Sequence, residues 1–375
     1  RKEEVEGHPD DADRLGYTYG NQYEGDRGEI DVTEVFAEVD VPLLSDARYA
    51  EYLAVDAAVR YSDYSTIGDA TTWKLGLVWQ PLSSLTLRAT VAEATRSPSI
   101  QELFTPAGQT FEFIADPCDI NNLGNGSDFR TANCAQLLTE LGVDPSTFLD
   151  PNVGAIPGLV GGNEDLREET ADTVTWGLIY TPKFIQGLTI SVDWYDIELE
   201  DAINYTSPQD AADLCVDLPS FNNNFCNLIT RRDDGGIDDF SQRPENVTSF
   251  TTRGVDFNIS WIGEPQSWGA LAVQLSGNKL NELNTVSLPG APSESLLGQK
   301  DAPEWQANLD VEWSLGGATL RWQTHYFDET YRFDQNTMRN NPNIVASKYL
   351  EYDRKLTHDL YGSYLFENDV KLYVG

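Results

Sequence analysis

The feature that most limits the possible folds is a pair of long segments, 170–181 and 188–198, in which apolar and polar side chains alternate. Alternation places successive side chains on opposite faces of a β-strand, so two such segments joined by a short turn predict an antiparallel hairpin. Pro182 and Gly187 lie in the turn between them. Each arm has about eleven residues, roughly twice the usual length of a strand in a water-soluble domain. About eleven tilted residues is the length that crosses a lipid bilayer.

Other segments alternate in the same way, and together they predict twelve strands. The predicted strands are 32–41, 49–61, 71–80, 85–93, 170–181, 188–198, 250–262, 271–275, 305–313, 320–326, 356–366 and 370–374. The connections between them are alternately short and long, with one brief exception at 62–70. Short turns at one end of the strands and long loops at the other are typical of a bacterial outer-membrane β-barrel.

Three parts of the chain lie outside this pattern. Residues 1–31 are polar and acidic and contain several glycines, so we expect a loop there. Residues 94–169 and 199–245 are predicted as long loops on the outward side of the strands. With these loops, residues 1–375 form one partial barrel domain. The first residues, Arg-Lys-Glu-Glu, suggest a piece of a longer protein.

The composition excludes several classes of protein. Lys and Arg total 25 against 61 Asp and Glu, a formal charge of −36, whereas nucleic-acid binding needs a basic face. Aromatic residues make up 11% of the chain, which argues against disorder. No run of eighteen apolar residues occurs, so no transmembrane helix is predicted.

The tryptophans distinguish a membrane barrel from a water-soluble β-sandwich. Most lie near strand ends, as in the aromatic girdles that flank the apolar belt of a barrel, whereas a sandwich core would place them in mid-strand. Those on the predicted apolar face are Trp73, Trp79, Trp176, Trp194, Trp261, Trp305, Trp313 and Trp322. The opposite face carries charged side chains that a wet lumen can hold but a packed core cannot: Glu34, Glu38, Asp56, Arg60, Lys74, Arg88, Asp193, Asp256, Asp310, Arg321 and His325.

The four cysteines form two local pairs, Cys118 with Cys134 and Cys215 with Cys226, one in each long insertion. Disulfides within each insertion are the hypothesis that we favour. Metal binding is the alternative, but no CxxC spacing and no neighbouring histidine supports it. Closing a loop of ~15 residues stabilises by roughly 3 kcal/mol in the chain-entropy model. Disulfides also indicate an oxidising compartment.

Four short motifs follow one another along the predicted strands. They are LRAT at 87–90 with TRSPSIQELF at 95–104, GNEDLREET at 162–170, RGVD at 253–256 and KLYVG at 371–375. In this order they resemble segments of the TonB-dependent receptors of Gram-negative outer membranes. The first is similar to that family's R-A-P-S … E-L-F segment. The second is similar to its G-N-P-D-L-K-P-E-T segment, with Glu164 and Glu168 in place of prolines.

The resemblance implies an all-β fold: a transmembrane, antiparallel, up-and-down barrel of 22 strands with a plugged lumen. This chain would supply about twelve of those strands, and the N-terminal plug, the TonB box and the last strand have no counterpart in it. The resemblance further implies a place in the Gram-negative outer membrane, among lipid and lipopolysaccharide. The implied partner is the TonB energy-coupling complex, reached through the absent plug region.

The function that the resemblance implies is energised import of a scarce solute, such as a siderophore, a saccharide or another small molecule. The charge of −36 would repel an anionic siderophore, which favours neutral saccharides or peptides. A passive porin and a secreted, acidic, carbohydrate-binding protein are the alternatives. No GxSxG, HExxH, P-loop or GxGxxG motif occurs, so neither an enzyme nor a cofactor is predicted.

Candidate site residues lie on the lumen face or where strands meet long loops. Arg88 faces the predicted lumen, and Arg96 and Glu102 follow the end of the same strand. The last two contact substrate or plug, or form a salt bridge that folds the loop over the rim. Asn163 and Asp165 precede the strand at 170, where Asn and Asp side chains commonly satisfy the backbone of a turn.

Two further candidates and one acidic run lie later in the chain. Arg253 and Asp256 could pair with each other at the rim or in the lumen. The run 233–239 is rich in Asp, but it lacks the spacing and the final Glu of an EF-hand. A solvated acidic loop is therefore favoured over a Ca²⁺ site, and no metal site is predicted.

Overall fold

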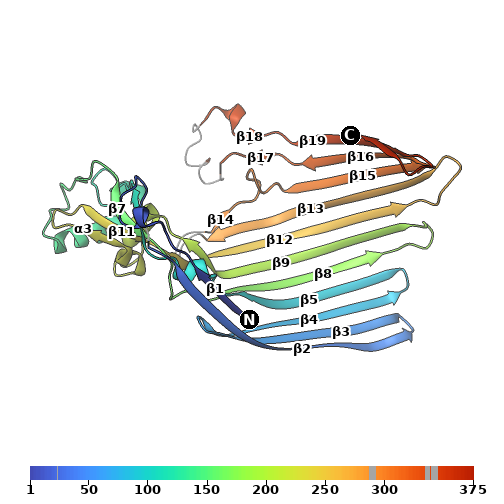
Figure 1. The fold of residues 1–375 in the computed structure, drawn as a ribbon, viewed down its shortest axis with the longest axis horizontal. Helices are drawn as coiled ribbons and strands as arrows, with labels where there is room; N and C mark the ends of the chain where they lie inside the picture. Colours follow the sequence, from blue (N-terminus) through green and yellow to red (C-terminus); the bar gives the residue numbers. More distant parts are fainter. Residues whose placement is uncertain (23, 287–292, 334–337, 339–344) are drawn as a thin grey trace.

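The computed structural model describes residues 1–22, 24–286, 293–333, 338 and 345–375. Its main feature is an antiparallel sheet of fourteen strands, in which chain neighbours lie side by side (Figure 1). The order is β1-β2-β3-β4-β5-β8-β9-β12-β13-β15-β16-β19-β20, with β14 paired to β13. Short turns gather at one end of the strands, and the long connections leave from the other (Figure 1).

The twelve predicted strands are all present. The sheet consists of β1 (Lys2–Glu6), β2 (Arg27–Ala47), β3 (Ala50–Tyr64), β4 (Gly68–Leu82), β5 (Leu85–Arg96), β8 (Glu169–Tyr180), β9 (Leu188–Tyr205), β12 (Pro244–Ile262), β13 (Ala270–Val286), β14 (Glu294–Ser295), β15 (Trp305–Leu315), β16 (Ala318–Phe327), β19 (Lys355–Leu365) and β20 (Lys371–Val374). The fold class predicted from alternation is thus confirmed.

Several strands continue beyond the alternating segments that predicted them. β9 runs to Tyr205, so the insertion predicted to start at Leu199 leaves the sheet only after that residue. Backbone pairing continues there with the start of β12, although the apolar alternation has stopped. Hydrophobic alternation therefore reports the extent of the apolar belt rather than the extent of the hydrogen-bonded ladder.

The N-terminal segment is not the loop that we expected. It contains β1 and a short helix, α1 (Asp11–Arg14). β1 pairs with the first residues of β2, from Lys2 opposite Asp31 to Glu6 opposite Arg27. Four of the five residues of β1 are charged, so the sequence shows no apolar alternation there. The strand is defined by its backbone pairing with β2.

One face of the large sheet is apolar and is left uncovered by the rest of the described chain. The paired residues Trp176 and Trp194 lie on it, with ring centroids 6.1 Å apart. Large side chains there stay exposed, among them Trp176 at 54%, Leu320 at 56% and Leu360 at 71%. Among the described residues, no helix is long and apolar enough to span a membrane.

The remaining elements lie mostly in the two long insertions. They are α2 (Ile100–Phe104), β6 (Gly108–Glu112), α3 (Arg130–Glu140), β7 (Ile156–Val160), α4 (Pro208–Asp217), β10 (Ile229–Arg231), β11 (Ile237–Gln242), the 3₁₀ helices η1 (Leu123–Asn125) and η2 (Asn224–Leu228), and, after β16, β17 (Thr330–Tyr331), η3 (Ser347–Tyr349) and β18 (Glu351–Tyr352).

Candidate functional site

The two insertions combine into one folded lobe, here defined as residues 97–168 and 206–243, at the long-connection end of the sheet (Figure 1). A second sheet runs through the lobe in the order β10-β11-β7-β6. β6 and β7 come from the first insertion, and β10 and β11 come from the second. β11 and β7 pair in parallel, with Phe240 opposite Gly158. The two segments are therefore one structural unit rather than two independent loops.

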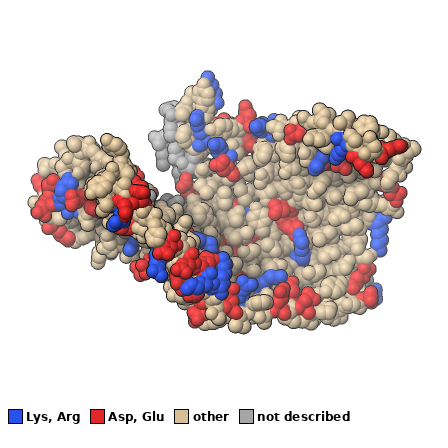
Figure 2. Space-filling model, in the orientation of Figure 1, with Lys and Arg blue, Asp and Glu red and all other residues tan. Residues whose placement is uncertain are grey.

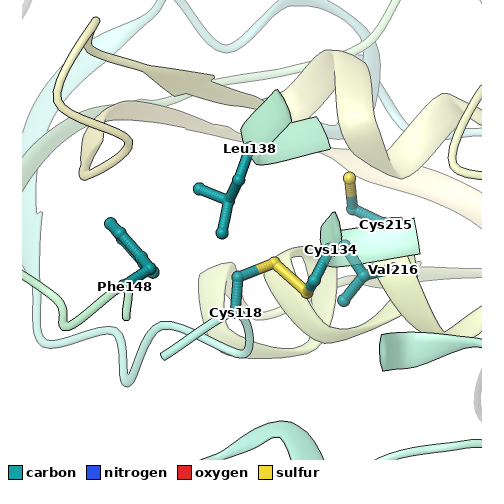
Figure 3. Packing of buried hydrophobic residues seen from close by; sticks show 6 residues of the cluster. All are labelled: Cys118, Cys134, Leu138, Phe148, Cys215 and Val216. Atoms are coloured by element: carbon teal, nitrogen blue, oxygen red, sulfur yellow. A yellow bond between two sulfur atoms is a disulfide. The ribbon is translucent and has the colours of Figure 1, made fainter. Parts of the chain in front are cut away.

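Both disulfides lie in this lobe. Cys118 is bonded to Cys134 and Cys215 to Cys226, which confirms the pairing within each insertion. Leu138, Phe148 and Val216 complete a buried cluster around the sulfurs (Figure 3). The cluster draws residues from both insertions, so each disulfide also helps to hold the other segment in place.

Buried ion pairs join the insertions. Arg130 on α3, with only 5% of its side chain exposed, contacts Asp213 at 2.6 Å and Asp217 at 2.5 Å, both on α4. Burial is the main cause that raises the pKa of the Asp213 carboxyl, and the neighbouring Asp217 adds to it. Arg231 makes a similar contact, at 2.5 Å, with the fully buried Asp116. Removing one partner of such a pair leaves an unpaired buried charge.

The cations of the lobe are all arginines. Among residues 97–168 and 206–243, all of which are described, there is no lysine or histidine. Each arginine has a carboxylate partner: Arg130, Arg167, Arg231, Arg232 and Arg243. Acidic residues are left over and gather on the outer surface of the lobe (Figure 2). No arginine of the lobe is therefore without a carboxylate partner, although the side chain of Arg167 is largely exposed.

The acidic run 233–239 also contains carboxylates that contact an arginine. Gly235 has a φ of 91°, a conformation that glycine adopts readily, and the run turns there between β10 and β11. Arg232 lies 3.2 Å from Asp234 and 3.6 Å from Asp238. No group of three or more His, Cys, Asp or Glu side chains suited to a metal occurs in the described parts of the chain.

Where the first insertion leaves the sheet, Arg96, Glu102 and Glu169 form a cluster of ion pairs, here called the Arg96 cluster. Arg96 contacts Glu169, its cross-strand partner, at 2.5 Å and Glu102 at 3.0 Å. Ser99 and Glu102 cap α2 reciprocally. Burial opposes ionisation of Glu102, but the contacts with Arg96 and Ser99 outweigh it, so the pKa of Glu102 lies below its usual value. Of the two predicted roles for Arg96 and Glu102, the contacts fit the salt bridge that folds the loop over the rim.

Asn163 and Asp165 lie in the turn that leads into β8. The Asn163 amide donates to the Pro244 carbonyl at 2.9 Å, and its oxygen accepts from the Asp165 N–H at 3.0 Å. The Asn163 N–H donates to the Glu102 carbonyl at 2.8 Å, which connects the turn to the Arg96 cluster. Asn163 thus satisfies backbone groups as predicted, whereas no described side chain contacts the Asp165 carboxylate.

Arg88 lies on the polar face in mid-strand. It donates two hydrogen bonds to Asp193, at 2.8 and 2.7 Å, across the intervening strand β8. The residue between them is Gly177, where a Cβ atom would come 1.9 Å from the Asp193 carboxylate. Lys74 with Asp56 and Arg321 with Asp310 are further pairs on this face. Each of these three cations on the polar wall therefore has a carboxylate partner.

Arg253 and Asp256 do not pair, so that expectation was wrong. They are three residues apart in β12, which puts them on opposite faces of the sheet. Arg253 shares the apolar face with Trp194 and lies nearer the long-connection end, where it contacts Asp196, Glu198 and Glu282. Asp256 lies on the polar face and accepts a hydrogen bond from Asn278.

Sequence reasoning missed the residues that hold the lobe together. The Asn246 side chain bonds the N–H and carbonyl of Arg167 and the carbonyl of Asp201. The Asn223 side chain caps η2 and donates to the carbonyl of Cys215. Neither position has a local pattern that could reveal a bond to a distant segment. Only the closeness of Asn223 to a cysteine pair offered a signal.

Comparison with known proteins identifies the family. A sequence model of the family described as TonB dependent receptor-like, beta-barrel, matches residues 5–375. The chain belongs to this family. It is a family of outer-membrane receptors rather than enzymes. No curated protein sequence matches the chain.

Solved structures of TonB-dependent receptors share the fold. The siderophore receptor PirA from Acinetobacter baumannii matches with a TM-score of 0.55 at 13% identity, over 91% of this chain and 40% of its own. A mutant of the ferric enterobactin receptor PfeA from Pseudomonas aeruginosa, in complex with enterobactin, matches with a TM-score of 0.55 at 13% identity, over 90% and 38%. The FrpB iron transporter from Neisseria meningitidis matches with a TM-score of 0.50 at 10% identity, over 94% and 40%. The chain thus spans about 40% of the length of these proteins.

Proposed function

We propose that this chain forms part of the wall and the outward lobe of an outer-membrane importer, which captures a scarce solute and admits it with energy from the TonB complex. The observation that carries the proposal is one receptor-type sheet with an uncovered apolar face, a polar face of paired ions, and a stapled lobe at its long-connection end. An apolar outer face and a polar interior suit a wall between lipid and water.

The position of charged residues on the apolar face supports this orientation in the membrane. Beyond Trp176 and Trp194, toward the lobe, the same face carries charged residues. Asp172 lies opposite Glu198 in the strand register, and Asp196 lies opposite Arg253. Aromatic rings followed by charges are expected where lipid tails end and head groups begin. The lobe then lies on the side of lipopolysaccharide and external solute.

The location is tested by fractionating cells that produce the whole protein. Recovery in the outer-membrane fraction, solubilised only by detergent, is the expected result. Recovery in the soluble fraction would reject both the importer and a porin, and would favour a secreted acidic protein.

The coupling is tested by uptake. Strains with the receptor gene, the TonB gene or neither deleted are compared for accumulation of labelled oligosaccharides and ferric siderophores under limitation. An importer loses accumulation of its solute in either deletion, because TonB supplies the energy. Accumulation that survives deletion of TonB would identify a passive porin.

A further inference from the structure

A polar groove lies where the lobe meets the strand ends. Its volume is about 550 Å³, within the range of roughly 300–1,000 Å³ typical of small-ligand sites. One wall is the turn 163–167 that leads into β8, and the other combines η2 with residues 243–247, where the chain enters β12. The groove lies next to the Arg96 cluster, because Asn163 in its wall donates its N–H to the Glu102 carbonyl.

The groove walls are held by side chains that are already committed. Asn163 and Asn246 bond backbone groups on both sides, and Asn223 fixes the start of η2. The Cys215–Cys226 disulfide anchors η2 to α4. A cavity with walls fixed in this way loses little freedom when a ligand binds, which favours affinity.

The groove is electrically balanced within a strongly acidic chain. It is lined by two carboxylates, Asp165 and Glu245, and by two guanidinium groups, Arg167 and Arg243. Arg243 lies 3.2 Å from Glu245, and Arg167 lies 3.3 Å from Asp201. Each of these two cations has a carboxylate partner, and the charges of the lining cancel, so the groove has no net positive charge that would attract an anionic ligand.

Two polar groups in the groove are left without protein partners. Among the described residues, none bonds the side-chain amide of Asn224 or the carboxylate of Asp165, and both residues are exposed. An amide offers two donors and an acceptor, and a carboxylate offers acceptors only. Leu218 and Val247, which are half-buried, add apolar surface beside them.

We propose that this groove binds a neutral, polyhydroxylated solute, an oligosaccharide, by hydrogen bonds to Asn224 and Asp165. Sugar hydroxyls both donate and accept, so they match an amide next to a carboxylate without bringing charge. Sugar C–H faces pack on the apolar part of the wall. The inference rests on the proposed function, because it names the class of solute that the lobe captures.

The test uses the whole protein in detergent, fluorescently labelled, on an array of neutral oligosaccharides built from glucose, mannose and xylose. Ferric enterobactin serves as the anionic comparison in a titration. The variants N224A and D165A should each weaken binding of the captured oligosaccharide about tenfold or more, the effect of losing about 1.4 kcal/mol. The controls N227A and E164A change exposed neighbours outside the groove lining and should bind like the wild type.

Hydrogen exchange of the wild type with the same oligosaccharide gives a second readout that needs no variant. Protection should rise at 163–167 and 223–228 and stay unchanged in the turn 233–239. Absence of binding to every neutral oligosaccharide, equal loss in variants and controls, or preference for ferric enterobactin would each overturn the inference. Binding to purified lipopolysaccharide alone would also overturn it, since the groove would then face the membrane's own sugars.

Failure of this inference can be told from failure of the proposed function. If accumulation requires both the receptor and TonB but the solute is not a saccharide, the importer stands and the groove assignment fails. If oligosaccharide binds the groove but accumulation survives deletion of TonB, the assignment stands and energised import fails.

Discussion

The contact of Arg130 with Asp213 and Asp217 leads to the sharpest prediction, because it joins the two insertions through one buried cation. The Arg130 guanidinium donates to Asp217 at 2.8 and 2.5 Å, to Asp213 at 2.6 Å and to the Asn122 carbonyl at 3.3 Å. The substitution Arg130→Met keeps most of the side-chain volume and removes all four bonds. Two carboxylates of α4 then face each other without the cation.

The expected magnitude follows from burial. Breaking a buried pair by removing one partner costs about 3–5 kcal/mol, because the remaining charge stays uncompensated. At 1.36 kcal/mol per factor of ten, local opening of the lobe should increase by roughly two to three and a half orders of magnitude. The large sheet should keep its stability, since the contact lies wholly within the lobe.

Hydrogen exchange followed by mass spectrometry measures this opening segment by segment. Peptides from α3 and from α4 should lose protection together, and peptides from β3 and β4 should not. The matched control is Arg167→Met: the Arg167 side chain is 67% exposed and, among the described residues, bonds only Asp201, at 3.3 Å. An exposed pair contributes about 0–1 kcal/mol. If Arg130→Met changed protection no more than the control, or loosened α3 alone, the reasoning would be refuted.

Three other changes test the structure at separate places. Burial raises the folded-state pKa of Asp213 above its unfolded value of about 3.9, so the ionised form of Asp213 lowers the stability of the lobe as pH rises above that value. Asp213→Asn should therefore gain stability relative to wild type as pH rises above about 4, measured by thermal unfolding. Gly177→Ala should separate Arg88 from Asp193 and cost about 1–3 kcal/mol in urea unfolding, whereas Gly124→Ala, with no heavy atom within 4 Å of the added Cβ, should not. Replacing both Cys215 and Cys226 by Ala should cost about 2–4 kcal/mol, read as faster exchange in η2 with α3 affected less.

Most of the large sheet could be predicted because each of the twelve predicted strands carries its own signal. Alternation marks the segment that lies in the apolar belt, and Pro182 with Gly187 marks the turn between β8 and β9. The ends of strands could not be predicted in this way. At Tyr205 the ladder continues without an apolar face, and only pairing with β12 defines it.

The lobe could not be predicted, for a different reason. Its sheet pairs β7 with β11, more than seventy residues apart in the chain, and neither strand alternates over enough residues to indicate a partner. The cysteines showed that each insertion is closed on itself, which the disulfides confirm. No local sequence pattern indicated that Arg130 of the first insertion would form an ion pair with Asp217 of the second. Contacts of this kind are set by tertiary packing and leave no periodic trace.

The ion pairs of the lobe arginines connect its stability to the selectivity that we propose for it. Arg130 and Arg231 are buried and form ion pairs with carboxylates inside the lobe, and Arg232 forms ion pairs within the acidic turn. The cations that hold the two insertions together are thus the ones that an anionic ligand would need. The surface that remains is acidic and repels anions, so the proposed solute would be recognised mainly by hydrogen bonds. In the importer that we propose, this acidic surface would repel anionic chelates before any specific contact forms, and the balanced groove beside Asn224 would admit a neutral solute with little electrostatic repulsion.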